Sequence, residues 1–148
     1  MGIQIEIECV IARPPSAVTR AILDPAKAPL WNEGLQRFEV TAGEAGEAGA
    51  TGRLHYLQGR RHYVMEDRLV LVDPGRRYVS EVTGNGLRAR VETLLTPLGD
   101  DATLLTVRWS GRGTRPWTWV LLPFMRGAVA RGAERDLRLL KQLVEQGS

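Results

Sequence analysis

Apolar and polar residues alternate from the start of the chain. The odd positions from Ile3 to Ile11 are apolar, whereas Gln4, Glu6 and Glu8 between them are polar. A period of two is typical of a β-strand that buries one face, because successive side chains of a strand point to opposite sides. We therefore predict an initial strand whose odd positions face the core.

Two short helices are predicted to follow this strand. Pro15 suits the first turn of a helix, and Val18 and Ala21 provide its inner stripe. Asp24-Pro25 then restarts the chain, since aspartate can cap a helix and proline is preset for its first turn. The second helix is expected to end at Trp31.

The middle of the chain alternates between strand-forming runs and turn residues, which predicts an antiparallel meander. Glycine, proline, asparagine and aspartate mark turns between runs that are rich in β-branched and aromatic residues. The glycine-rich stretch at residues 43–52 predicts a flexible connection. The six strands predicted in this region are residues 35–41, 53–58, 61–72, 77–83, 87–96 and 102–110.

The C-terminal part predicts a long amphipathic helix. From about Leu121, apolar residues recur at spacings of three and four, and charged residues occupy the opposite side. Pro123 should delay the start of this helix, which leaves residues 117–122 as a separate turn or loop. The apolar stripe contains Met125, Val129, Ala133, Leu137, Leu140 and Val144, opposite Arg131, Glu134, Arg138, Lys141 and Glu145.

A hairpin turn at Gly59-Arg60 fixes which side chains share a face of the sheet. It pairs Tyr56 with Tyr63 and places both on the side that we expect to face inward. His55 and His62 then lie on the outer surface. Two histidines without a third ligand make a poor metal site, so no bound metal is expected. The inward positions are Tyr56, Tyr63, Met65, Tyr78, Leu87, Ala89, Thr93 and Trp109.

Asp67 continues the inward parity of this strand. A carboxylate on the cavity side would have its pKa raised by desolvation, which makes Asp67 a candidate general base or ligand anchor. Two alternatives remain open: a β-bulge that turns Asp67 outward, or an ion pair with Arg88 or Arg90 on a neighbouring strand.

The order of these elements resembles the helix-grip superfamily, also called SRPBCC or START-like. That superfamily includes the plant pollen-allergen (Bet v 1-like) fold, lipid-transfer START domains and bacterial polyketide cyclase/dehydrase-like proteins. The resemblance rests on IEIECVIARPPSAVTRAILDPAKAPLW, on Asp73-Pro74-Gly75-Arg76 between strands, and on LRLLKQLVE near the end. It covers nearly the whole chain, and the order of the motifs is more specific than any one of them.

The resemblance implies one α+β domain over residues 1–148. A curved antiparallel sheet of about seven strands would wrap around the long C-terminal helix, with two short helices after the first strand. In different relatives the cavity between sheet and helix carries lipids, hormones or quinones, or shapes polyketides. Because relatives with one fold differ in function, the ligand must be argued from the site.

Composition excludes several other classes of function. The hydrophobic fraction of 43% and the charged fraction of 25% are ordinary for a globular chain, and no run is long enough for a membrane span or a signal peptide, so a cytoplasmic location is expected. Cys9 is the single cysteine and cannot form an internal disulfide. The net charge of +3 comes from scattered arginines, which argues against a nucleic-acid surface.

The sequence favours binding of a hydrophobic or aromatic small molecule, such as a lipid, a quinone or a polyketide-like compound, without a cofactor. The alternative is a polyketide cyclase/dehydratase-type enzyme that uses Asp67 as base and a tyrosine as hydrogen-bond donor. The expected ligand-binding residues are Trp31, Phe38, Tyr56, Tyr63, Met65, Tyr78, Trp109, Trp117, Met125 and Val129.

The segment from Trp117 to Met125 is unusually apolar for a junction between a strand and a helix. It can be a lid over the cavity, core at the end of the sheet, or a contact for a membrane or a second subunit. Arg112, Arg115 and Arg126 beside the aromatic residues suit a lipid headgroup boundary. Stable membrane insertion is not expected, and a homodimer is left open.

Overall fold

A computed structural model describes residues 2–147 and contains one open antiparallel sheet of seven strands in these residues. The spatial order β1-β7-β6-β5-β4-β3-β2 places the first strand beside the last and the second at the opposite edge. The predicted meander and its inward and outward parity are confirmed by the register. The strands are β1 (Gly2–Ile11), β2 (Leu35–Ala42), β3 (Thr51–Gln58), β4 (Arg61–Asp73), β5 (Arg77–Gly84), β6 (Leu87–Pro97) and β7 (Thr103–Gly113).

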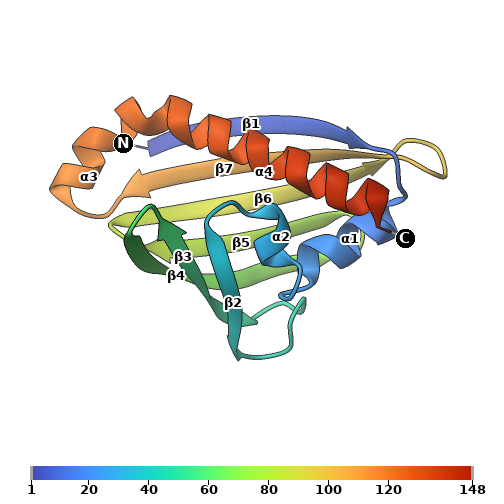
Figure 1. Cartoon of the computed structure of the whole chain (residues 1–148), viewed down its shortest axis with the longest axis horizontal. Helices are drawn as coiled ribbons and strands as arrows, with labels where there is room; N and C mark the ends of the chain where they lie inside the picture. The colour runs from blue at the N-terminus through green and yellow to red at the C-terminus, as the bar shows by residue number, and fades with distance from the viewer. Residues whose placement is uncertain (1, 148) are drawn as a thin grey trace.

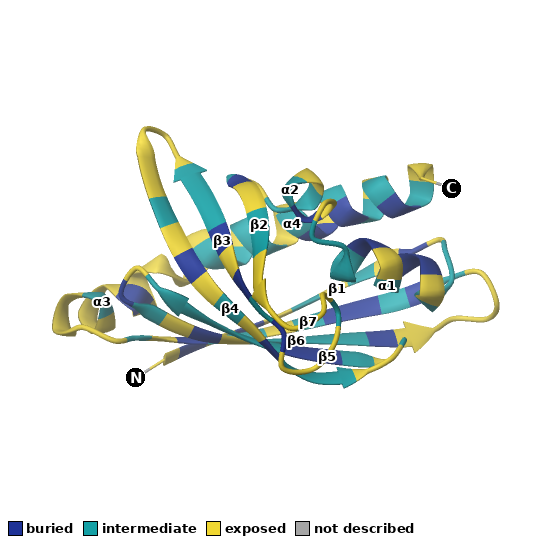
Figure 2. Cartoon of the chain, turned by 90° about the horizontal axis from the view of Figure 1, so that it is seen from below, coloured by how far each residue is buried: buried dark blue, intermediate teal, exposed yellow. Residues whose placement is uncertain are grey.

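The long C-terminal helix crosses one face of this sheet (Figure 1). It packs mainly on β1, on the two short helices after β1, and on the 3-10 helix that precedes it. In Figure 2 the strands β2, β3 and β4 curl up from the plane of β5, β6 and β7 on the side that carries the helix. The helices are α1 (Pro15–Leu23), α2 (Ala28–Trp31), α3 (Pro116–Leu121), η1 (Leu122–Met125, 3-10) and α4 (Arg126–Gln146).

Glycine and asparagine shape the two tight hairpin turns. Gly59 has a φ of 61°, and Asn85 and Gly86 have φ values of 53° and 75°. These are left-handed backbone angles, which glycine and asparagine adopt at lowest cost and which match the twist of the flanking strands. The turn at Gly59 pairs Tyr56 with Tyr63, as the sequence predicts.

Several predicted boundaries differ from the structure by a few residues, and three of these differences have a local cause. Residues 117–122 are predicted as a turn or loop, but residues 116–121 form α3, because Pro116 occupies its first turn and Thr118 bonds back to Arg115. The second short helix begins only at Ala28, since Asp24 first closes a turn by accepting a hydrogen bond from the N–H of Ala26. The glycine-rich connection ends earlier than predicted, because Thr51 already belongs to β3.

The interior consists of three hydrophobic clusters. The first lies between α1, the C-terminal half of α4 and the sheet, and its best-buried members include Ile11, Val18, Leu105 and Leu140. The second lies under β2, β3 and β4 around Leu54 and Met65. The third joins Ile3, Ile5 and Leu122 at the start of α4.

No helix in the described part of the chain is long and apolar enough to cross a membrane.

Leu140 should carry a large share of the packing between α4 and the sheet. Its side chain is 1% exposed, so Leu140→Ala removes buried apolar contacts and leaves a cavity. We expect the free energy of unfolding in urea to fall by about 2 to 5 kcal/mol. Leu30→Ala is the control, since Leu30 is 59% exposed and its truncation should change stability by less than about 0.5 kcal/mol. Equal effects of the two substitutions would contradict this account of the core.

Candidate functional site

A partly exposed strip of side chains lies on the inner face of the sheet between the three clusters. Its members belong to none of the three hydrophobic clusters. Several of their cross-strand partners on adjacent strands do belong to one. An inward side chain keeps exposed surface only where other side chains leave space in front of it. We call this strip the inner groove, and it consists of Asp67, Ser80, Val91 and Thr93.

Two aromatic rings form one wall beside the inner groove. Tyr56 on β3 and Tyr63 on β4 are direct cross-strand partners, and their rings stack with centroids 5.1 Å apart and an interplanar angle of 13°. Burial raises the pKa of both hydroxyls, so each remains a neutral hydrogen-bond donor at physiological pH. The pair supplies a flat apolar surface with polar tips, which suits an aromatic ligand.

Asp67 lies on the inner face and is not turned outward. It pairs in regular register with Gly52 and Val82, and the irregularity in β4 comes later, between Leu69 and Leu71. Burial alone raises the pKa of Asp67 to about 6, with no contribution from a charged partner. The alternatives of a bulge or of an ion pair with Arg88 or Arg90 are therefore wrong, since those arginines alternate with buried Ala89 and lie on the outer face.

Asp136 on α4 is a second carboxyl that the sequence analysis did not identify. Its Oδ1 atom accepts a hydrogen bond from the backbone N–H of Glu33 at 3.1 Å, and burial raises its pKa to about 6. The charges of Asp136 and Asp67 both help to raise the pKa of Tyr56, so both carboxyls are within electrostatic reach of that hydroxyl. A signal was available, because Asp136 lies three residues after Ala133 and four before Leu140, on the apolar stripe of the helix.

The structure brings most of the predicted ligand-binding residues to the interior. Phe38, Tyr56, Tyr63 and Met65 share the cluster under β2, β3 and β4. Trp109 and Val129 share the cluster at the start of α4, where the Trp109 ring covers Gly111 so closely that no Cβ would fit there.

Trp31 and Tyr78 both pack in the cluster under α1, but their polar atoms differ. The Tyr78 hydroxyl accepts a hydrogen bond from the N–H of Gly75 at 2.8 Å and donates one to Thr19 at 3.3 Å. Tyr78 is thus a buried core residue whose hydroxyl already has partners. The indole N–H of Trp31, in contrast, is buried without a hydrogen-bond partner among residues 2–147, so it is a donor that a ligand oxygen could satisfy.

Trp117 and Met125 are not brought into the interior. Both side chains are about half exposed, and neither belongs to a hydrophobic cluster. Of the apolar segment, only Leu122 is buried, where it packs with Ile3 and Ile5. The interpretation of the whole segment as core is therefore wrong.

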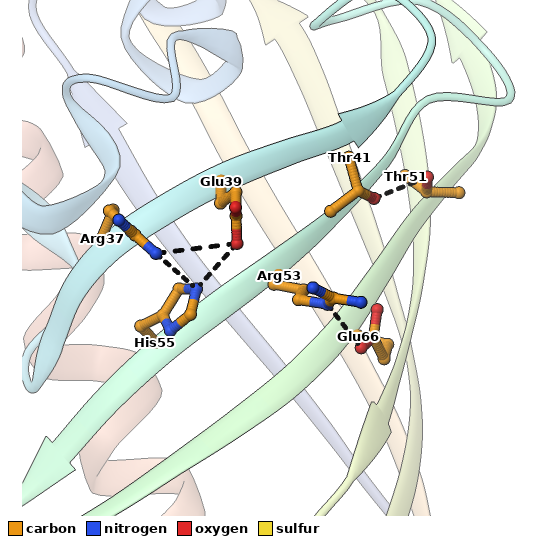
Figure 3. Close-up of polar contacts among 7 residues, drawn as sticks. All are labelled: Arg37, Glu39, Thr41, Thr51, Arg53, His55 and Glu66. Carbon is orange, nitrogen blue, oxygen red and sulfur yellow. Dashed lines mark hydrogen bonds and ion pairs between the residues drawn. The ribbon is translucent and has the colours of Figure 1, made fainter.

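The outer face of β2, β3 and β4 carries polar pairs (Figure 3). His55 Nε2 lies 3.1 Å from Glu39 and 3.3 Å from Arg37, and Arg53 bonds Glu66 at 3.1 Å. The predicted outward position of His55 is confirmed. On this face His55 contacts Glu39 and Arg37, which form an ion pair with each other.

Two depressions open elsewhere on the described surface. The larger, of about 550 Å³, lies on the outer face of the sheet and is lined by Arg88, Arg90 and Arg112 among others. The smaller, of about 240 Å³, lies between β1 and α4 beside Cys9 and Leu137. Neither coincides with the inner groove.

The raised pKa of Asp67 predicts a specific dependence of stability on pH. The unfolded carboxyl ionises near pH 4 and the folded one near pH 6, so ionisation progressively destabilises the fold as pH rises between these values. Asparagine cannot ionise. The stability of Asp67→Asn relative to the parent chain should therefore increase by roughly 1 to 3 kcal/mol between pH 4 and pH 7. Urea unfolding at each pH measures this, and Asp100→Asn in an exposed turn is the control. A pH-independent difference for Asp67→Asn would contradict the buried, unpaired carboxyl.

Solved structures with the same fold confirm the architecture. The Zhui aromatase/cyclase from Streptomyces sp. R1128 has a TM-score of 0.81 and 18% identity, and the match covers 99% of this chain and 95% of that one. A START superfamily protein from Mycobacterium smegmatis has a TM-score of 0.82 and 18% identity, with 98% and 99% covered. Ara h 8.0201 has a TM-score of 0.79 and 15% identity, and the match covers 99% of this chain and 100% of that one.

Among curated proteins, none matches the sequence. The model of one protein family, described as polyketide cyclase/dehydrase and lipid transport, matches residues 2–145. This match spans nearly the whole chain and agrees with the resemblance carried by the order of its elements. The chain belongs to the polyketide cyclase/dehydrase and lipid transport family.

Proposed function

We propose that the protein binds a hydrophobic small molecule with an aromatic part and at least one polar oxygen in the inner groove. The observation that carries the proposal is the set of side chains on and around the partly exposed part of the inner face. Asp67 follows the stacked tyrosines on the inner face of β4, the charges of Asp67 and Asp136 act on the hydroxyl of Tyr56, and α2 adds a buried indole N–H without a partner among residues 2–147. Binding sites for small molecules commonly combine apolar walls with a few polar groups that fix orientation.

Each part of the groove has a distinct task in this proposal. The stacked rings of Tyr56 and Tyr63 and the nearby side chains of Met65 and Trp109 supply apolar area, which provides most of the affinity. A ligand carbonyl would accept a hydrogen bond from a tyrosine hydroxyl or from Trp31. A ligand hydroxyl would donate to Asp67, which relieves part of the cost of its burial.

Family membership supports this reading without naming the ligand. The family description includes lipid transport as well as cyclisation and dehydration, and one solved structure with this fold is an aromatase/cyclase. The identity to that enzyme is 18%, so the similarity supports a common fold and does not identify the substrate.

Binding is tested with palmitate, menadione and quercetin, which represent an acyl chain, a quinone and a polyphenol. Native mass spectrometry and tryptophan fluorescence should detect at least one of them, and Tyr56→Ala should weaken its binding by roughly tenfold or more through lost stacking area. Val64→Ala is the matched control, since Val64 lies on the outer face of β4 and is exposed. A protein that binds none of the three probes, or a Tyr56 variant that binds as tightly as the control, would contradict the proposal.

A second candidate function is cyclisation of a poly-β-ketone, and the pair of carboxyls with raised pKa favours it. In this reading the ionised Asp67 takes a proton from a carbon between two carbonyls, and the resulting carbanion attacks another carbonyl carbon of the same substrate. Tyr56 donates a hydrogen bond to the oxygen on which negative charge develops. A base with a pKa of about 6 is largely ionised at neutral pH and still basic enough to accept the proton.

Turnover is tested with a synthetic poly-β-ketone thioester, and the cyclised product is measured by liquid chromatography and mass spectrometry. Asp67→Asn should lower kcat by about 10² to 10⁴ relative to the parent chain and to the Asp100→Asn control. The parent rate should rise with pH through about 6 as Asp67 ionises. Absence of product, or a rate that Asp67→Asn leaves unchanged, would exclude this function while leaving the binding proposal intact.

A further inference from the structure

An exposed apolar patch projects beyond the end of the sheet. It lies on α3 and η1, whereas the inner groove lies on β4, β5 and β6. We call it the α3–η1 patch, and in Figures 1 and 2 α3 lies at the end of the molecule opposite the C-terminus. Phe124 is 84% exposed, and Trp117 and Trp119 are 53% and 52% exposed. Large contiguous apolar surfaces on a folded chain mark places where something else binds. The members of the patch are Trp117, Trp119, Val120, Leu121, Phe124 and Met125.

The patch is held in place by close packing of its backbone. A Cβ on Gly113 would clash with the backbone nitrogen of Trp119, so this glycine lets α3 sit directly on the end of β7. The N–H of Thr114 donates to the carbonyl of Gly86 at 2.8 Å, which ties the segment to the turn between β5 and β6. Leu122 anchors the other side in the core. The fold therefore presents these aromatic side chains outward from a fixed base.

Positive charge surrounds the patch. Between Ser110 and Ala133 the sequence contains four arginines and no aspartate or glutamate. Arg112 pairs across the sheet with Arg88, and both line the outer depression of about 550 Å³, whose one carboxylate belongs to Glu81. Arg126 donates to the carbonyl of Gln4 at 2.9 Å, and Gln4 also lines that depression. Arg126, which follows Met125 of the patch, thus contacts a residue that lines the depression.

We propose that the α3–η1 patch and the adjoining arginines dock the protein reversibly on an anionic lipid surface. Tryptophan and phenylalanine favour the boundary between headgroups and acyl chains, and arginines beside them can contact lipid phosphates. A nearby anionic surface attracts each basic residue, and these attractions add up. Charge complementarity therefore supports a lipid surface as the occupant.

A second copy of the chain fits this surface less well. A two-fold symmetric interface brings each patch against its own copy, so the arginines that surround one patch would face the arginines that surround the other. Like charges placed opposite one another oppose association. Self-association is accordingly an outcome that the experiment must be able to detect.

The test is flotation of the full-length chain with two kinds of vesicle, phosphatidylcholine alone and an equal mixture of phosphatidylcholine and phosphatidylglycerol. We expect binding to the mixed vesicles, weaker binding to the neutral ones, and loss of binding as salt increases. Phe124→Ser should weaken binding to mixed vesicles by roughly tenfold or more, because burial of one such side chain contributes about 1.5 to 3 kcal/mol. Arg88→Gln combined with Arg112→Gln should weaken it by a comparable factor.

Matched variants separate docking from other effects. Leu30→Ser and Arg60→Gln change an exposed apolar residue and an exposed arginine outside the patch, so they should float like the parent chain. Tyr56→Ala should also float normally, since it alters the inner groove and not the surface. A cooperative thermal transition well above the temperature of the assay shows that each variant is folded.

Three results would overturn the proposal. They are equal binding to neutral and anionic vesicles, equal flotation of Phe124→Ser and Leu30→Ser, and a dimer in sedimentation that Phe124→Ser dissociates. Failure of ligand binding in the groove would leave the flotation result unaffected, because the two experiments use different variants and different readouts.

Discussion

The position of α4 depends on packing at its two ends. Near its C-terminus, Leu140 and Val144 pack against α1 and the sheet, and near its start Leu122 and Val129 pack against β1. The backbone of the helix therefore runs along β1, α1 and α2, and the helix reaches the middle strands through side chains of the first cluster. The curled strands β2, β3 and β4 rise on the same side of the sheet as the helix (Figure 2). On this face the side chains of the inner groove, Asp67, Ser80, Val91 and Thr93, keep part of their surface exposed.

The groove contains groups that a purely structural interior would avoid. Burial of an ionisable carboxyl without a charged partner is unfavourable, and Asp67 is such a group. Asp136 is partly compensated by the backbone N–H of Glu33, yet its pKa is also raised. Buried groups with perturbed pKa values concentrate at functional sites, since binding or proton transfer can repay a cost that folding does not. Ligand binding and proton transfer make different use of the same two carboxyls.

Charged residues on the strands of the sheet are arranged differently from those in the segment near α3. Along the sheet, arginines form ion pairs with glutamates, as Arg77 and Arg108 do with Glu92 and Arg53 does with Glu66. Near α3 the arginines lie in a segment that contains no acidic residue and that also exposes aromatic side chains. The ion pairs neutralise part of the outer face of the sheet, whereas the segment near α3 has no acidic residue of its own to offset its arginines.

Local patterns determined much of this structure. Strand parity placed Tyr56, Tyr63 and Asp67 on one face, because side chains alternate along a strand and the turn at Gly59 fixes the register. Asp136 was missed because the helical stripe was read by its apolar members alone. The sequence by itself thus determined the order of the elements, the register of the β3–β4 hairpin and the family, all of which depend on short-range periodicity and turn chemistry. Only the tertiary structure decided that Tyr78 is core, that the charge of Asp136 acts on Tyr56 and that the segment from Trp117 to Met125 is exposed except for Leu122. These features depend on how distant elements pack and shield one another from water.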